Sequence, residues 1–253
     1  MNLSNPSKIS QYVGYAAGIG TLMVVFMIYT GWTADRLFYN YGPVSAEVKT
    51  LAEGMARHGE FHSSGTGFGG LKSDQYERFE QLAKVATDDE LEYLLGHYSP
   101  AVRLYAFQAL IEKPQTAPLK FLDKLTYKLA EIETLEGCKG GRWQVEDKAA
   151  SLLINRYYDQ DGDSLTVISL TKLDEFMLYH GSFHINRGFS LLRIGHLPEH
   201  YARSRELAYG EHHALAIVAL AKAGKSEDQS LIKERYWADD FTRAMLEREG
   251  FSF

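Results

Sequence analysis

Apolar residues recur every three to four positions along most of this chain from residue 46 onward. That spacing gives a helix one apolar face, so it predicts helices through nearly all of this region. We find no convincing run of alternating apolar and polar residues, and the predicted fold class is therefore all-α. The predicted helices cover residues 46–59, 73–86, 87–98, 99–113, 119–135, 143–158, 171–181, 198–210, 211–224, 226–237 and 239–250.

Several of these segments carry residues typical of helix ends. Ser73 stands where a capping side chain is expected, and Thr87 with Glu90 forms the T-x-x-E pattern of a capping box. Ser99 precedes Pro100, and proline fits best at the first position of a helix. The stretch between residues 62 and 73, rich in glycine and serine, is predicted to be a flexible loop.

The segments 87–98 and 99–113 form a predicted pair of helices. The first would bury Leu91, Leu94 and Leu95, and the second an alanine-rich face that lets a neighbouring helix approach closely. One pair cannot bury all of its apolar surface alone, so we expect further pairs stacked beside it.

The stretch "SPAVRLYAFQAL" (99–110) resembles the HEAT-repeat pattern, in which Pro-x-Val-Arg is followed by alanine and Ala-Leu. A second stretch, 212–234, resembles the alanine-rich helix, glycine turn and closing helix of the same family. The resemblance implies an α-solenoid that binds other proteins and has no catalytic residues. The region 119–209 departs from the repeat.

The segment from Tyr12 to Trp32 contains 21 residues without a charge. As a helix it would be about 31 Å long, which is enough to cross a bilayer core of about 30 Å. A buried core helix or a cleaved signal peptide are the alternatives, but no small-x-small cleavage site follows. We therefore expect an uncleaved anchor, a single-pass protein of a bacterial inner membrane. The lysine before the span favours a helical body in the periplasm.

Gly14 and Gly18 have the G-x-x-x-G spacing that lets two membrane helices pair, which predicts homo-oligomer formation through this segment. The expected organisation is a tail at 1–11, a transmembrane helix at 12–32, a juxtamembrane helix and Gly/Ser-rich loop at 33–72, and a HEAT-like helical domain at 73–253.

Composition narrows the function classes. The 253 residues carry a formal net charge of -6 and no run of basic residues, which argues against a nucleic-acid partner. The single cysteine, Cys138, excludes an intrachain disulfide framework and a cysteine-based zinc site.

The stretch that begins at Asp159 resembles the start of an EF-hand calcium loop, with Asp159, Asp161 and Asp163 at ligand positions 1, 3 and 5. Position 6 is Ser164 instead of glycine, and position 12 is Leu170 instead of glutamate. Ca²⁺ is one interpretation, and an acidic solvated turn is the other. Otherwise no cofactor is expected.

Six of the nine histidines lie between His180 and His213, and "HLPEH" (196–200) matches the H-x-x-E-H signature of zinc peptidases. Pro198 argues against it, because His196 would then fall outside the helix. We found no signature of nucleophilic catalysis, so no catalytic residue is predicted.

Three functions remain. The first is a non-catalytic interaction or scaffold subunit of a membrane complex, with other membrane proteins as partners. The second is an acidic inhibitor or immunity-type protein that masks a toxin or an enzyme. The third is a metal-dependent protein that uses the histidine-rich segment or the aspartate loop.

Overall fold

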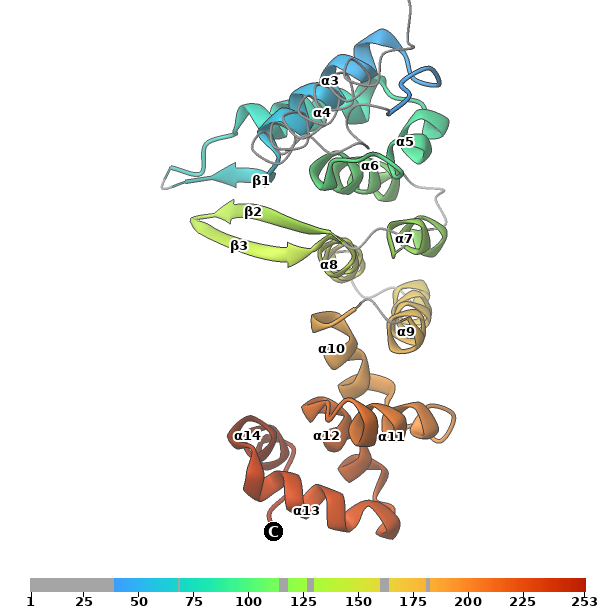
Figure 1. Ribbon diagram of the computed structural model, residues 1–253, viewed down its shortest axis with the longest axis vertical. Coiled ribbons are helices and arrows are strands. Elements are labelled where there is room, and N and C mark those ends of the chain that lie inside the picture. Colours follow the sequence, from blue (N-terminus) through green and yellow to red (C-terminus); the bar gives the residue numbers. More distant parts are fainter. Residues whose placement is uncertain (1–38, 68, 114–117, 127–129, 160–163, 181–182) are drawn as a thin grey trace, which may run out of the picture.

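The computed structural model describes residues 39–67, 69–113, 118–126, 130–159, 164–180 and 183–253, and shows a predominantly helical chain with one small sheet. The helices follow one another along the long axis, from α3 at one end to α13 and α14 at the other (Figure 1). The elements are α3 (Ala46–His58), β1 (Phe61–Thr66), α4 (Asp74–Val85), α5 (Asp88–Leu94), α6 (Pro100–Glu112), α7 (Pro118–Thr126), β2 (Glu131–Gly137), β3 (Lys139–Gln144), α8 (Val145–Asp159), α9 (Ser164–Tyr179), α10 (Ile185–Ile194), α11 (Tyr201–Gly210), α12 (Ala214–Ala223), a 3-10 turn η1 (Ser226–Asp228), α13 (Gln229–Ala238) and α14 (Asp240–Arg248).

The predicted helix starts are confirmed where the sequence carried a cap. The Ser73 side chain accepts a hydrogen bond from the Tyr76 N–H at the start of α4. Thr87 and Glu90 form the complete capping box of α5. Pro100 is the first residue of α6, although the Ser99 side chain makes no capping bond. Local hydrogen-bonding chemistry therefore decides where these helices begin.

The first of two hydrophobic cores is built around α6. This helix is buried on all sides, since ten of its thirteen residues are buried, and α3, α4, α5, α7 and α8 pack around it. The three leucines predicted on the preceding helix, at 91, 94 and 95, are buried as expected. The expectation that α6 buries a single alanine-rich face is wrong, because neighbours cover it from every direction.

A three-stranded sheet lies beside this core, in the order β1-β2-β3. β1 pairs with β2 in parallel, and β2 pairs with β3 as an antiparallel hairpin. Gly137, with a positive φ of 58°, lies in the two-residue connection of the hairpin. The all-α prediction therefore needs correction: residues 131–135, predicted to be helical, are a strand. Ile132 and Thr134 are buried there, while Glu131 and Glu133 are exposed, which is the two-residue period of a strand.

The second core is built around α12, which is covered by α10, α11, α13 and α14. Six of its ten residues are buried. Gly224, with φ of 68°, ends the helix in the left-handed conformation that glycine adopts at low cost. A helix that the sequence reading did not predict, α10, supplies part of this core through Leu191 and Ile194.

A buried aspartate joins the two cores. Asp147 of α8 accepts hydrogen bonds from the backbone N–H groups of His184, Ile185 and Asn186, at 3.0, 3.2 and 3.0 Å. These are the otherwise unpaired donors at the start of α10. The carboxylate thus fixes the start of α10, in the second core, against α8, in the first.

The predicted membrane segment, residues 12–32, and the pairing glycines Gly14 and Gly18 lie outside the described residues. Within the described ranges, no helix is both long and apolar enough to cross a bilayer.

Candidate functional site

The predicted calcium site falls almost wholly outside the described part of the chain. Asp161 and Asp163 lie in the undescribed segment 160–163, and of Asp159 only the backbone is described, at the end of α8. The proposed Ca²⁺ ligation therefore stays a prediction.

In the part of the chain that it describes, the structure does not gather the histidines between residues 180 and 213 into one ligand site. His200 contacts the Tyr179 hydroxyl through Nδ1 at 3.2 Å and approaches Glu175 through Nε2 at 3.8 Å. His196 lies in the turn before α11, where burial lowers its pKa. Among the described residues, none of these histidines belongs to a group of three side chains that could ligate one ion.

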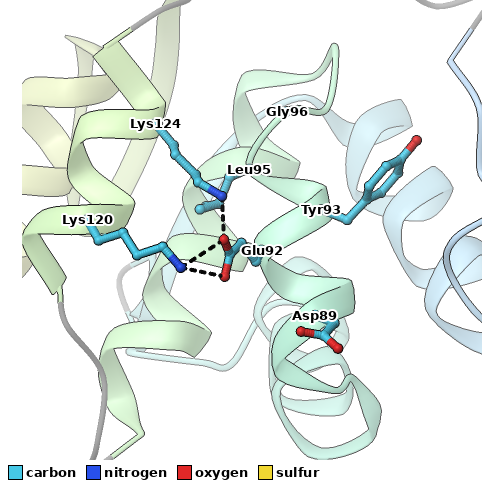
Figure 2. Close-up of a pocket in the computed structure, with 7 residues that line it drawn as sticks. All are labelled: Asp89, Glu92, Tyr93, Leu95, Gly96, Lys120 and Lys124. Carbon is cyan, nitrogen blue, oxygen red and sulfur yellow. Dashed lines mark hydrogen bonds and ion pairs between the residues drawn. The ribbon is translucent and has the colours of Figure 1, made fainter.

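An open groove lies between α5 and α7. Lys120 and Lys124 extend from α7 and meet the Glu92 carboxylate of α5 (Figure 2), with Lys120 Nζ 3.1 Å from Oε1. The two lysines lower the pKa of Glu92 by hydrogen bonding to its charged form. Because these charges pair with one another, we interpret the groove as the place where an ionic contact holds α7 against α5. Its other lining residues are Asp89, Tyr93, Leu95 and Gly96.

Three side chains that can ligate a metal converge where α3 ends and β1 begins: His58, Glu60 and His62. The Nε2 atoms of the two histidines are 3.4 Å apart. Glu60 Oε2 lies 3.0 Å from Nε2 of His62 and 3.9 Å from Nε2 of His58. Within the described ranges, this is the single group of three or more potential metal ligands.

The backbone brings these residues together because α3 stops abruptly. Gly59 has φ of 83°, a left-handed conformation that ends the helix and turns the chain into β1. The buried Tyr105 hydroxyl then holds the strand, since it accepts a hydrogen bond from the His62 N–H at 2.7 Å and donates one to the His62 carbonyl at 3.1 Å.

Two further side chains, Ser73 and Gln75, support this junction. His62 Nδ1 lies 3.0 Å from Ser73 Oγ, the capping hydroxyl of α4. The buried Gln75 amide donates to the Glu60 carbonyl at 2.8 Å and to the Met55 carbonyl at 3.3 Å. The end of α3, the start of β1 and the start of α4 are thus tied together.

Electrostatics at this group favour a neutral His58. Burial lowers its pKa, and the neighbouring His62 lowers it further, against a smaller opposing effect of Glu60. A neutral imidazole has a lone pair that can bind a metal ion. The sequence signal is the short H-x-E-x-H pattern of "HGEFH" (58–62). This pattern was not predicted to be a site because it spans the end of a helix and the start of a strand, where neither a helical nor a strand period applies.

A second feature missed by the sequence reading is a set of exposed apolar side chains in residues 158–253. Nine large hydrophobic side chains are exposed among the described residues, and seven of them lie in this part of the chain. Ile185 and Phe189 stand four residues apart on α10, and Trp237 and Phe241 stand four apart where α13 meets α14. The seven are Tyr158, Tyr179, Ile185, Phe189, Tyr209, Trp237 and Phe241.

These features define a helical protein with two cores, a small sheet and several exposed apolar side chains in residues 158–253. No family model, no curated protein and no solved structure matches the chain. The resemblance of residues 99–110 and 212–234 to HEAT repeats is therefore wrong as a family assignment. The structure explains the local similarity: both stretches contain the central helix of a core, and such a helix is rich in alanine wherever neighbours pack closely around it.

Proposed function

We propose that this protein is a non-catalytic docking protein that binds another protein through the exposed apolar side chains of residues 158–253. The observation that supports this is the uneven distribution of those side chains. Trp237 and Phe241 are 67% and 57% exposed, although the core beneath them is closed around α12. Exposed aromatic residues of this kind are enriched among the side chains that dominate protein interfaces.

The partner that fits is a protein with an apolar contact surface. A phenylalanine or tryptophan side chain gains most when it enters an apolar pocket that excludes water.

We propose that the exposed apolar side chains of residues 158–253 lie close to a membrane. The support for this location is the uncharged sequence of residues 12–32, which would anchor the helical body in a bacterial inner membrane on the periplasmic side. An anchor would concentrate the docking surface near membrane-bound partners. Protease protection of residues 39–253 in intact spheroplasts and inverted vesicles tests the side of the membrane.

Affinity capture of the full-length protein from detergent-solubilised native membranes tests the docking function. Wild type is compared with the double variants I185S/F189S and W237S/F241S, and with the control L71S, whose side chain is 74% exposed outside this surface. We expect a stoichiometric partner that is lost at least about tenfold from one double variant and retained by the control. Equal recovery by all variants would contradict the proposal. Binding of wild type to protein-free vesicles, lost in the same variants, would point to lipid instead.

A further inference from the structure

We propose that His58, Glu60 and His62 bind a divalent first-row transition ion of the zinc class, with two imidazole nitrogens and one carboxylate oxygen as its protein ligands. This inference is independent of the docking function. It rests on the separations of the three ligating atoms, on the groups that orient them and on the access of solvent to the site.

The separations fit a tetrahedral ion. Three points 3.4, 3.9 and 3.0 Å apart lie on a circle with a radius of about 2.0 Å, which is the length of a zinc–nitrogen or zinc–oxygen bond. An ion placed slightly above the plane of these atoms would therefore reach all three. In a tetrahedral zinc site with bonds of this length, neighbouring ligand atoms are about 3.3 Å apart, close to the separation of the two Nε2 atoms.

A metal-free hydrogen-bond cluster fits the same atoms less well. The separation of the two Nε2 atoms, 3.4 Å, exceeds the usual length of a hydrogen bond between nitrogen donors and acceptors. The Glu60–His58 separation of 3.9 Å is also too long for a hydrogen bond. Only the Glu60–His62 contact, at 3.0 Å, has a normal length. A shared ion satisfies all three separations at once.

The surroundings resemble the outer shell of a metal site. A ligating histidine usually donates its second ring N–H to a neighbouring acceptor, which fixes the tautomer and the ring orientation. Ser73 Oγ is placed to accept that proton from His62 Nδ1 at 3.0 Å. Because Ser73 is held as the cap of α4 and His62 by Tyr105, the buried ligand is oriented before any ion binds.

The chemistry of the ligands selects the ion. Imidazole nitrogen with carboxylate oxygen suits Zn²⁺ and its first-row neighbours, whereas Ca²⁺ and Mg²⁺ prefer oxygen ligands alone. Three protein ligands leave a fourth position for water. His58 also lines an open groove of about 560 Å³ together with Arg57 and Arg78, so water can reach the ion there.

Two of the ligands can be removed with little risk to the fold. The side chains of His58 and Glu60 are 39% and 48% exposed, whereas His62 is buried at 8%. Variants H58A and E60Q are therefore the informative ones, and H212A, which removes an exposed histidine elsewhere, is the matched control. Circular dichroism of each variant establishes that the helices are retained.

The test is titration of chelator-treated full-length protein with Zn²⁺ by calorimetry, followed by substitution with Co²⁺. We expect one ion per chain in wild type and H212A, with the intense visible absorption of four-coordinate Co²⁺. H58A should weaken Zn²⁺ binding by at least about 100-fold, and E60Q by at least about tenfold. Absence of binding in wild type, or equal binding by wild type and H58A, would overturn the proposal.

Discussion

The two cores of this protein have the same kind of packing but differ in the apolar residues that they leave exposed. Each surrounds one central helix, α6 in the first and α12 in the second. The elements that build the first core, α3 to α9 with the sheet, leave four large hydrophobic residues exposed among the described positions: Leu71, Val85, Tyr158 and Tyr179. The second core is built from fewer elements, α10 to α14, and leaves five such residues exposed: Ile185, Phe189, Tyr209, Trp237 and Phe241. The second core therefore exposes large apolar side chains more densely along the chain than the first.

This difference indicates which residues contribute to stability and which are candidates for binding a partner. Apolar residues that no packing requirement explains are candidates for contact with a partner. In the first region, the His58–Glu60–His62 cluster lies where α3 ends and β1 begins. We therefore expect changes in the first region to alter stability or metal binding, and changes at the exposed residues of the second to alter partner binding alone.

The largest stability effect is expected inside the two central helices. L104A in α6 and L220A in α12 each remove a fully buried side chain, and each should lower the free energy of unfolding by about 3 kcal/mol. Urea unfolding followed by circular dichroism measures both. A loss below about 1 kcal/mol for L220A alone would show that the second core is loosely packed, which would undo the parallel between the cores.

The next effect is expected at the junction of the cores. D147A removes the acceptor of three backbone N–H groups at the start of α10, so it should cost about 2–3 kcal/mol. Hydrogen exchange should show faster exchange of the amides of residues 184–186. The control D240A removes a side chain that is 91% exposed and should change neither measurement. Unchanged exchange in D147A would contradict the junction described here.

A smaller and pH-dependent effect is expected at Glu90. Hydrogen bonds from the backbone N–H groups of Ser45 and Thr87 lower the pKa of Glu90 from 4.5 to about 2. Because the folded pKa is the lower one, the stabilisation is complete above pH 4.5 and is lost as the pH falls toward 2.

E90Q should therefore cost about 1–2 kcal/mol at pH 7 and flatten the decline of stability in acid. Thermal unfolding between pH 2 and pH 7 measures this. An unchanged acid profile in E90Q would show that another carboxyl group controls acid unfolding.

The smallest stability effect is expected on the exposed surface of the second region. W237S and F241S should each change the free energy of unfolding by no more than about 0.5 kcal/mol, because both rings are mostly in solvent. The same unfolding experiment measures it. A loss of several kcal/mol would mean that these rings serve the fold, and the contrast between the two regions would then disappear.

The helix starts that are marked by local sequence signals were predicted correctly from the sequence. The cap at Ser73, the capping box of Thr87 and Glu90, and Pro100 all mark helix starts in the structure. These signals work because the interacting groups are only a few residues apart.

The sheet was missed because its pairing is not local. β1 pairs with β2 across more than sixty residues, for example Phe61 with Thr134, and β1 falls in a stretch rich in glycine and serine. Residues 131–134 do alternate between charged and uncharged side chains. The alternation is short, however, and comes directly after a segment with helical spacing. The metal-ligating cluster was missed for a related reason, since its spacing spans a helix end and a strand start, where neither period applies.

The most direct test of the docking account is site-specific photocrosslinking in cells, with a photoreactive phenylalanine analogue at position 189 or 241 and at position 71 as the control. The account predicts that the exposed positions of the second region yield one shared crosslinked protein, and that position 71 yields none. Crosslinks of equal yield at all three positions, or the absence of a protein crosslink at both 189 and 241, would contradict it.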